Sequence, residues 1–247
     1  YYRKIKMKVQ LFIPCFIDQL FPTTAFNMIK VLESQGCEIS YNPDQTCCGQ
    51  PAFNAGYWDE CESVAKKFNQ DFNDYDYIVS PGGSCAGFIR NHYDKLLKNE
   101  KGEISNEKKP IQRNLYEFTE FLTEVLGVTD LGAELYGVAT YHDSCGALRE
   151  CGIKEAPREL LSKVKGLELR EALDCEVCCG FGGTFAVKFE AISIAMGEQK
   201  IINASTTEAD YLISTDLSCL MHLDGYIRKN GNKIKIMHIA DVLASGW

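Results

Sequence analysis

Short apolar runs alternate with amphipathic stretches along this chain. Residues 9–13 and 77–80 are short, apolar and partly β-branched, which predicts two buried strands. Between them, residues 24–35 carry apolar side chains at helical spacing and are followed by Gly36, so we expect a helix that ends at this glycine. Further along, a second helix is predicted because apolar side chains fall on one of its faces: Trp58, Cys61, Ala65, Phe68 and Phe72.

The second part of the chain repeats this pattern, with helices predicted over residues 155–165 and 192–204. Strands that alternate with helices are typical of α/β units with parallel strands. The last segments of the two parts also resemble each other, since residues 115–122 match residues 236–243 in their pattern. The pattern therefore indicates a duplicated unit.

We expect an α/β fold of two tandem Rossmann-like halves, each built on a parallel sheet and related by approximate two-fold symmetry. The first half is predicted to span residues 1–127 and the second residues 128–247. The charged segment 98–110 is interpreted as a solvated loop of the first half.

Eight of the twelve cysteines form two matching sets, one in each half. Each set begins with a single cysteine after an apolar segment, continues with Cys-Cys-Gly, and ends with a cysteine in the repeated segments 76–85 and 210–219. The sets are Cys15, Cys47, Cys48 and Cys85, and Cys145, Cys178, Cys179 and Cys219. Such spacing in two copies favours a shared chemical purpose over incidental core cysteines.

The single cysteines follow predicted strands, and ligands of parallel sheets bind outside the carboxyl ends of the strands. Thiolates are soft ligands that suit zinc, copper(I) and iron–sulfur clusters. The glycine after each cysteine pair lets the backbone approach an inorganic group closely. We therefore predict a metal site in each half, held by the eight matched cysteines.

Four cysteines have no counterpart in the other half. Cys61 lies on the apolar face of a predicted helix and Cys37 begins a strand, so both are expected in the core. Cys151 is interpreted as structural. Cys175 forms a Cys-x-x-Cys with Cys178, a spacing known for zinc and redox pairs. Because Asp44 occupies its place in the first half, we interpret Cys175 as structural too.

Several polar residues near the second set are candidates for chemistry. His142 could hydrogen-bond a cluster sulfur, accept a substrate proton, or simply end a strand. His222 follows Cys219 by one helical turn and could act as a ligand or as a neighbour of the metal. Arg149, like Arg158 and Asp216, could bind a carboxylate substrate or form a surface ion pair. Catalytic candidates are thus His142, His222 and Arg149.

Composition narrows the functional classes. The 247 residues are 45% hydrophobic and 24% charged, as in an ordinary globular protein, and the net charge of −8 argues against nucleic-acid binding. No apolar run reaches the roughly 18 residues of a membrane span, and no signal-peptide core is present. We therefore expect a cytoplasmic protein, in which cysteines more often bind metal than form disulfides. Nucleotide-binding glycine motifs are also missing.

The two Cys-Cys-Gly sets resemble the duplicated cysteine-rich CCG domain family, over nearly the whole chain. This family includes the cysteine-rich subunit of heterodisulfide reductase and the iron–sulfur subunits of glycolate oxidase and anaerobic glycerol-3-phosphate dehydrogenase. Short segments of the second half are most similar to the lactate utilisation protein A branch of this family. Examples are Tyr-His-Asp-Ser-Cys145 and Cys-Cys-Gly-Phe-Gly-Gly-Thr184. The resemblance implies an oxidoreductase subunit, inactive alone, that transfers electrons through iron–sulfur clusters in a complex oxidising L-lactate to pyruvate. It implies one [4Fe–4S] cluster per half, a ferredoxin-like partner and a third subunit.

The chain departs from the family pattern in two places. Phe88 and His222 stand where the full motif ends in a further cysteine, which favours a four-cysteine cluster, or zinc in one half, over a five-thiolate cluster. Gly146 stands where relatives often have a histidine. If that histidine serves the substrate or the cluster, His142 could have this role here. Alternatives are a zinc-stabilised docking subunit, or a subunit of the glycolate oxidase or heterodisulfide reductase type. The second set has more titratable neighbours, so we expect the chemically active cluster there.

Overall fold

The computed structural model describes residues 7–72, 75–97, 104 and 110–247. It contains two sheets of four parallel strands each, with the same strand order. In spatial order, the first sheet contains β2 (Glu38–Tyr41), β1 (Lys8–Leu11), β3 (Tyr77–Ser80) and β4 (Leu115–Glu117). The second contains β6 (Lys165–Leu169), β5 (Glu134–Tyr141), β7 (Tyr211–Ser214) and β8 (Lys235–His238). The α/β fold with two Rossmann-like halves is confirmed.

The register of the sheets shows which residues of the two halves correspond. Val9 pairs with Tyr77 in the first sheet, and Ala139 pairs with Tyr211 in the second. Just beyond these strands, the amide of Phe12 donates to the carbonyl of Val79 (3.0 Å) and the amide of His142 to that of Ile213 (2.8 Å). Phe12 and His142 therefore occupy equivalent places.

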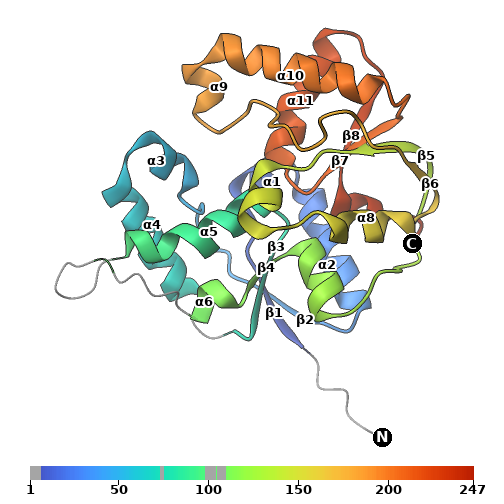
Figure 1. Ribbon diagram of the computed structural model, residues 1–247. Helices are drawn as coiled ribbons and strands as arrows, with labels where there is room; N and C mark the ends of the chain where they lie inside the picture. Colours follow the sequence, from blue (N-terminus) through green and yellow to red (C-terminus); the bar gives the residue numbers. More distant parts are fainter. Residues whose placement is uncertain (1–6, 73–74, 98–103, 105–109) are drawn as a thin grey trace, which may run out of the picture.

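Helices flank both sheets (Figure 1). In the first half they are α1 (Cys15–Leu20), α2 (Pro22–Ser34), α3 (Gln50–Ala55), α4 (Trp58–Asp71), α5 (Gly83–Leu96), α6 (Pro110–Arg113), α7 (Phe118–Glu120) and the π-helical turn η1 (Phe121–Val125). In the second half they are the π-helical turn η2 (Gly146–Glu150), α8 (Glu155–Ser162), α9 (Phe185–Lys188), α10 (Glu190–Ser205), α11 (Leu217–Lys229) and α12 (Ile239–Leu243). The helices predicted from periodicity are present as α2, α4, α8 and α10.

Two predicted elements were too long. The strand expected over residues 9–13 ends at Leu11. The helix expected over residues 155–165 ends at Ser162, because Lys165 already begins strand β6. The loop predicted over residues 98–110 lies mostly outside the described residues. In the part of the chain that is described, no helix has the length and apolar character needed to cross a bilayer.

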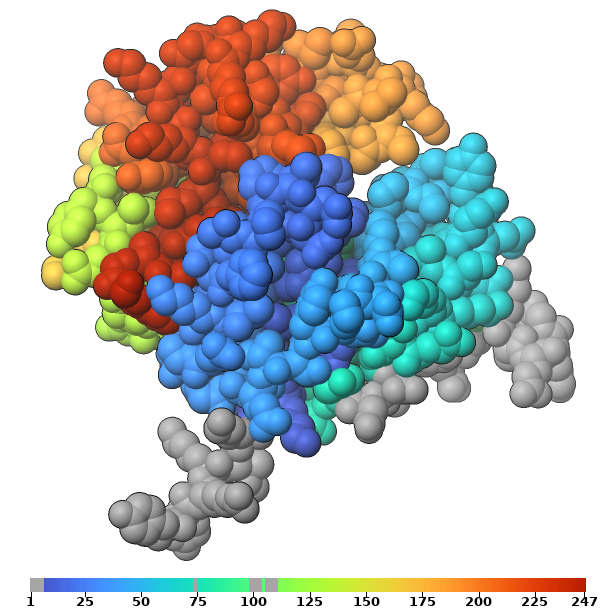
Figure 2. All heavy atoms as spheres, turned by 180° about the vertical axis from the view of Figure 1, so that it is seen from behind, coloured from blue at the N-terminus to red at the C-terminus, as the bar shows by residue number. Residues whose placement is uncertain are grey.

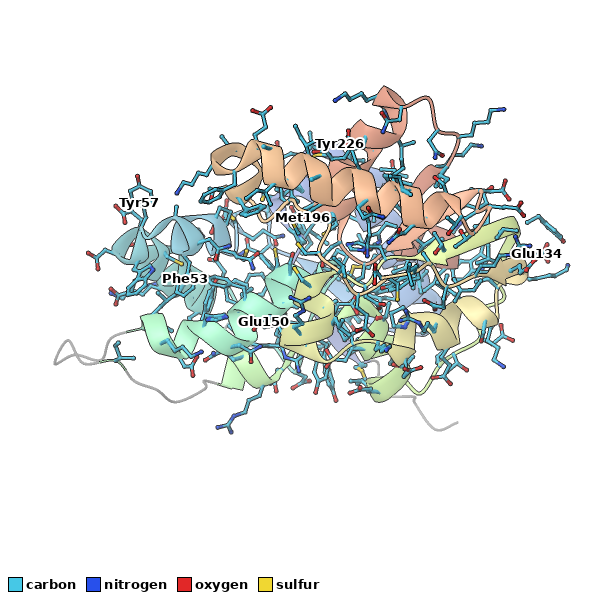
Figure 3. All side chains as sticks on the ribbon, turned by 45° about the horizontal axis from the view of Figure 1, so that its top comes forward. Phe53, Tyr57, Glu134, Glu150, Met196 and Tyr226 are labelled. Carbon is cyan, nitrogen blue, oxygen red and sulfur yellow. The ribbon has the colours of Figure 1, made fainter. Side chains whose placement is uncertain are left out.

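The two halves share a seam built from matching helix pairs. Helix α2 packs on α12 and α8 packs on α7, while α5 packs on η2 and α1 on α11. Figure 3 shows Glu150 of η2 beside α5, where its carbonyl accepts a hydrogen bond from the side chain of Asn91 (2.7 Å). One cluster of buried apolar side chains contains residues of both sheets, among them Leu11 and Ala139. The halves are therefore joined by a common core.

Equivalent buried residues at the ends of β4 and β8 make hydrogen-bond contacts with the opposite half. Glu117, at the end of β4, accepts a hydrogen bond from the hydroxyl of Thr215, which follows β7. His238 holds the same place at the end of β8, and its Nε2 lies 2.8 Å from the carbonyl of Pro81, which follows β3. Each sheet thereby fixes the segment that leads to the last cysteine of the other half.

Candidate metal centre

The structure brings the four cysteines of the first set together. Cys15 begins helix α1 just after β1, Cys85 lies in the first turn of α5, and the adjacent pair lies in the loop before α3. The sulfur atoms of Cys15 and Cys47 are 4.0 Å apart, and those of Cys48 and Cys85 are 3.3 Å apart. The amide of Gly49 points at the sulfur of Cys47 (3.4 Å).

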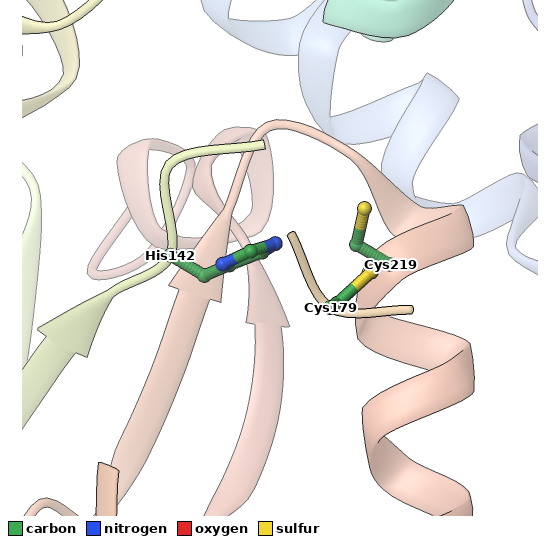
Figure 4. A group of neighbouring side chains, drawn as sticks. All are labelled: His142, Cys179 and Cys219. Atoms are coloured by element: carbon green, nitrogen blue, oxygen red, sulfur yellow. The ribbon is translucent and has the colours of Figure 1, made fainter. Parts of the chain in front are cut away.

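The second set has the same arrangement. Cys145 precedes η2, Cys219 lies in the first turn of α11, and the cysteine pair lies in the loop between β6 and α9. The amide of Gly180 donates to the sulfur of Cys178 (3.4 Å), as Gly49 does in the first half. In addition, the sulfur atoms of Cys179 and Cys219 lie within 4.8 Å of each other and of a ring nitrogen of His142 (Figure 4).

The sulfur atoms within each set share protons. Hydrogen bonds from the thiols of Cys15 and Cys48 lower the pKa of Cys47 to about 2. The same bond between Cys15 and Cys47 raises the pKa of Cys15. In the second half, bonds from Cys145 and Cys179 likewise lower the pKa of Cys178 to about 2. Crowded thiols with one ready thiolate are the donor set that a soft metal ion binds with release of protons.

Glycines form the backbone cradle of both sets. Gly49 and Gly180 have φ values of 85° and 92°, in the left-handed region that glycine adopts without strain. A Cβ on Gly180 would lie 2.7 Å from the carbonyl oxygen of Ser193, and one on Gly49 would lie 3.0 Å from the sulfur of Cys61. The glycine of each Cys-Cys-Gly is therefore required by its conformation and by close packing on a helix, whereas the sequence suggested close approach of the backbone to an inorganic group.

Both sets open into one cavity of about 180 Å³ at the seam. Six of the eight cysteines line it: Cys15, Cys47, Cys48, Cys85, Cys145 and Cys219. Other walls come from α1, from α3 and from the glycine turn before α9, and Figure 2 shows the surface hollowed where these three segments approach one another. The sequence predicted two sets at strand ends, but it did not predict that the sets share a cavity.

Asp216 bridges the two halves at the floor of this cavity. Its carboxylate accepts hydrogen bonds from the amide (3.1 Å) and hydroxyl (2.7 Å) of Ser84, and also from the hydroxyl of Ser144. Burial raises the pKa of Asp216, while the bonds from Ser144 and Ser84 oppose that shift. The surface ion pair considered for Asp216 is therefore wrong, because the side chain is only 2% exposed. It fixes the residues next to Cys85 and Cys145.

The three catalytic candidates are placed differently. His142 is 1% exposed, and neither ring nitrogen makes a hydrogen bond to any described residue. Burial, together with the charge of Lys200, lowers its pKa to about 3. His222 is half-buried, and its Nε2 lies 3.3 Å from the hydroxyl of Ser193. Of the three, only His142 has both ring nitrogens buried and without a hydrogen bond to a described residue.

Neither arginine considered from the sequence lines the cavity. Arg149 is exposed, and its guanidinium lies 3.5 Å from the carbonyl of Glu176. Arg158 donates two hydrogen bonds to the buried carboxylate of Asp143 (2.9 and 2.7 Å) and also pairs with Glu171. Its guanidinium is thus committed to an ion pair that holds the strand end before Cys145.

The remaining cysteines lie apart from the cavity lining. Cys37 and Cys61 are buried in the two apolar clusters, as expected. The sulfur of Cys151 lies 3.6 Å from the carbonyl of Gly83 at the seam. The carbonyl of Cys175 accepts a hydrogen bond from the buried ammonium group of Lys200 (2.8 Å), which anchors the loop that carries the second cysteine pair.

Comparisons with known proteins agree with this site. The cysteine-rich domain family CCG matches residues 9–90 and 139–224, which contain both cysteine sets. The chain is 41% identical to lactate utilization protein A 2 of Bacillus cereus (strain 03BB102) over 240 residues, which is 97% of this chain and 99% of that protein. It is 44% identical to lactate utilization protein A of Geobacillus sp. (strain WCH70) over 239 residues, 97% of this chain and all of that protein.

A solved structure shares the fold. The crystal structure of a hypothetical protein from Helicobacter pylori matches 97% of this chain with a TM-score of 0.66 at 12% sequence identity, and this chain spans about half (49%) of that protein's length. The fold, the paired cysteine sets and the full-length relatives lead to one assignment. The chain belongs to the lactate utilization protein A family and carries two copies of its cysteine-rich domain.

Proposed function

We propose that this chain is the iron–sulfur electron-transfer subunit of a complex that oxidises L-lactate to pyruvate. The observation that supports the proposal best is the shared cavity, because thiols of both halves reach one space. The names of the full-length relatives supply the link to lactate. One [4Fe–4S] cluster per half would be held by Cys15, Cys47, Cys48 and Cys85 and by Cys145, Cys178, Cys179 and Cys219.

The residues of the chain fit such groups. Eight thiols converge in two sets, and the amides of Gly49 and Gly180 point at a sulfur in each set. When bound, an iron–sulfur cluster accepts and releases single electrons at a potential set by its surroundings. Phe16 and Phe181, from opposite halves, meet edge to face (centroids 5.7 Å apart) in the cavity wall and restrict the access of water.

The proposed complex requires partners. Lactate oxidation releases two electrons, so a ferredoxin-like iron–sulfur subunit and a third subunit would carry the electrons onward and complete the catalytic site. We place the complex in the cytoplasm, where reducing conditions keep cysteines as thiols. All twelve cysteines of the chain are free, which agrees with that location.

Metal analysis of anaerobically purified, untagged protein tests the cofactor. We expect iron and acid-labile sulfide close to two clusters per chain, with visible absorbance that bleaches on reduction. The group of His142, Cys179 and Cys219 would also suit zinc, which binds imidazole and thiolate ligands together. Zinc without iron and sulfide would contradict the electron-transfer role and favour a zinc-stabilised docking subunit.

The substrate is tested in the complex reconstituted with its two partner subunits. We expect L-lactate to reduce the clusters of this chain faster than glycolate does. Preferential reduction by glycolate would favour a subunit of the glycolate oxidase type. Reduction of a heterodisulfide at the expense of reduced clusters would favour the heterodisulfide reductase type.

A further inference from the structure

The second cysteine set has a nitrogen donor that the first set lacks. His142 follows β5 and presents its ring toward the sulfur atoms of Cys179 and Cys219 (Figure 4), with one ligand atom of each residue within 4.8 Å of the others. The backbone-equivalent residue of the first half is Phe12, whose ring packs edge to face on Phe68 (centroids 5.1 Å apart). The imidazole is therefore present in only one of the two matching halves.

The imidazole of His142 has no bonding partner among the described residues. The ring is 1% exposed, and neither Nδ1 nor Nε2 makes a hydrogen bond. The carbonyl of Cys175 faces the ring outside hydrogen-bond geometry, and it already accepts from the amide of Asp143 (3.2 Å) and the ammonium of Lys200 (2.8 Å). Leaving a buried polar group unpaired costs about 1–3 kcal/mol. A buried polar group without a partner in the protein indicates that it binds another group, such as an ion.

The other two histidines of this half, the half-buried His222 and the buried His238, have contacts with the protein through their ring nitrogens. Nε2 of His222 lies 3.3 Å from the hydroxyl of Ser193, which donates its own proton to the carbonyl of Gly180 (2.8 Å). His238 contacts the carbonyl of Pro81 through Nε2 and accepts from the amide of Ala240 through Nδ1 (3.1 Å). The unused nitrogens of His142 are therefore not a general property of histidines in this fold.

We propose that His142 is a direct metal ligand of the second site, which makes that site a mixed thiolate–imidazole centre, whereas the first site is held by thiolates alone. The inference rests on the proposed function in that each half binds a metal group. Neutral imidazole is a common ligand for both iron and zinc, and the shared chemistry is a metal–nitrogen bond. In this centre His142 takes the place of one of the four thiolates proposed above, which removes a negative charge and raises the potential of an iron–sulfur centre. The two sites would then differ in potential.

Pulsed electron paramagnetic resonance on the reduced, metal-loaded full chain with ¹⁵N-labelled histidine tests this ligand. We compare wild type with two variants that each install the equivalent first-half residue, His142→Phe and the matched control His222→Phe. We expect the hyperfine coupling of a metal-bound nitrogen in wild type and in His222→Phe, and its loss in His142→Phe. The midpoint potential of one centre should fall in His142→Phe, while the other centre keeps its potential. If the His142→Phe variant does not fold, His142→Gln is used in its place.

Three outcomes would overturn the proposal while leaving the proposed function intact. They are bound iron with no nitrogen coupling in wild type, coupling that survives in His142→Phe or His142→Gln, and coupling lost equally in His222→Phe. For a zinc-only preparation, X-ray absorption at the zinc edge gives the same comparison through imidazole scattering. A chain that binds no metal under anaerobic conditions would overturn both this inference and the proposed function.

Discussion

Cys61 and Ser193 occupy the fourth position of α4 and α10, and each donates a hydrogen bond to the carbonyl of the glycine in a Cys-Cys-Gly. The sulfur of Cys61 lies 3.4 Å from the carbonyl of Gly49, and the hydroxyl of Ser193 lies 2.8 Å from that of Gly180. The duplicated unit therefore accepts either atom at this position. Cys61 contributes to the core and to the glycine turn rather than to the cavity.

This equivalence makes Cys61→Ser a matched control for Cys179→Ser. We expect Cys61→Ser to keep its metal content and lactate-dependent reduction near wild type, because serine already makes the same bond in the second half. Cys179→Ser should lose the second metal group and the reduction, since a serine hydroxyl does not supply a thiolate at neutral pH. Iron content and reduction rate in the reconstituted complex measure both. Equal losses in the two variants would indicate general destabilisation instead of lost ligation.

Glu117 is predicted to make stability depend on pH. Its carboxyl group is fully buried, and burial raises its pKa from 4.5 to about 7. Between these values the folded chain holds a proton that the unfolded chain releases. The free energy of unfolding should therefore fall as pH rises from 4.5 to 7, by roughly 3 kcal/mol at most.

The replacement Glu117→Gln removes the titration while an amide can still bond Thr119 and Thr215. We expect its free energy of unfolding, measured by urea denaturation across this pH range, to lose the slope seen in wild type. The same replacement at the exposed Glu190 should leave the slope unchanged. Parallel curves for wild type and Glu117→Gln would rule out the assigned role.

At the scale of elements, the contact between α5 and η2 depends on missing side chains. A Cβ on Gly87 of α5 would lie 2.4 Å from the Cβ of Glu150, and one on Gly146 would lie 2.4 Å from the Cα of Ser84. Gly225 of α11 also lies inside a helix, but a Cβ added there would have no heavy atom from other described elements within 4 Å. Packing therefore requires the glycine at position 87 of α5 but not the one at position 225 of α11.

We expect Gly87→Ala to lower the free energy of unfolding by about 1–3 kcal/mol, because the added methyl group forces the two halves apart. Gly225→Ala should raise it by up to about 1 kcal/mol, since alanine favours the helix and restricts the unfolded chain. Chemical denaturation of the two variants side by side gives the measurement. A similar gain in stability for both would show that the α5–η2 contact tolerates a wider separation.

For the whole molecule, the shared core predicts that the halves depend on each other. Helix α2 packs on α12, where Thr24 and Asn27 donate hydrogen bonds to Asp241 (both 2.9 Å), and α8 packs on α7. Residues 1–127 or 128–247 expressed alone would expose these faces to water. We expect neither segment alone to unfold cooperatively, and the two to associate when expressed together.

Circular dichroism and analytical ultracentrifugation check this expectation. As a control, the full chain cut at a protease site inserted beside the exposed Gly132 should remain associated and keep its metal. A sharp thermal transition for either isolated half would mean that residues 1–127 and 128–247 are independent domains that happen to touch.

The sequence determined the units of this protein, and the tertiary structure decided how the units meet. Periodicity and repetition predicted α2, α4, α8 and α10, the strands that precede Cys15 and Cys145, and the equivalence of the two cysteine sets, because these features depend on residues close together in the chain. The single cavity, the Asp216 bridge and the unpartnered ring of His142 come from the approach of distant segments. Local sequence patterns do not specify which surfaces pack against each other at the seam. These three features are therefore visible only in the folded structure.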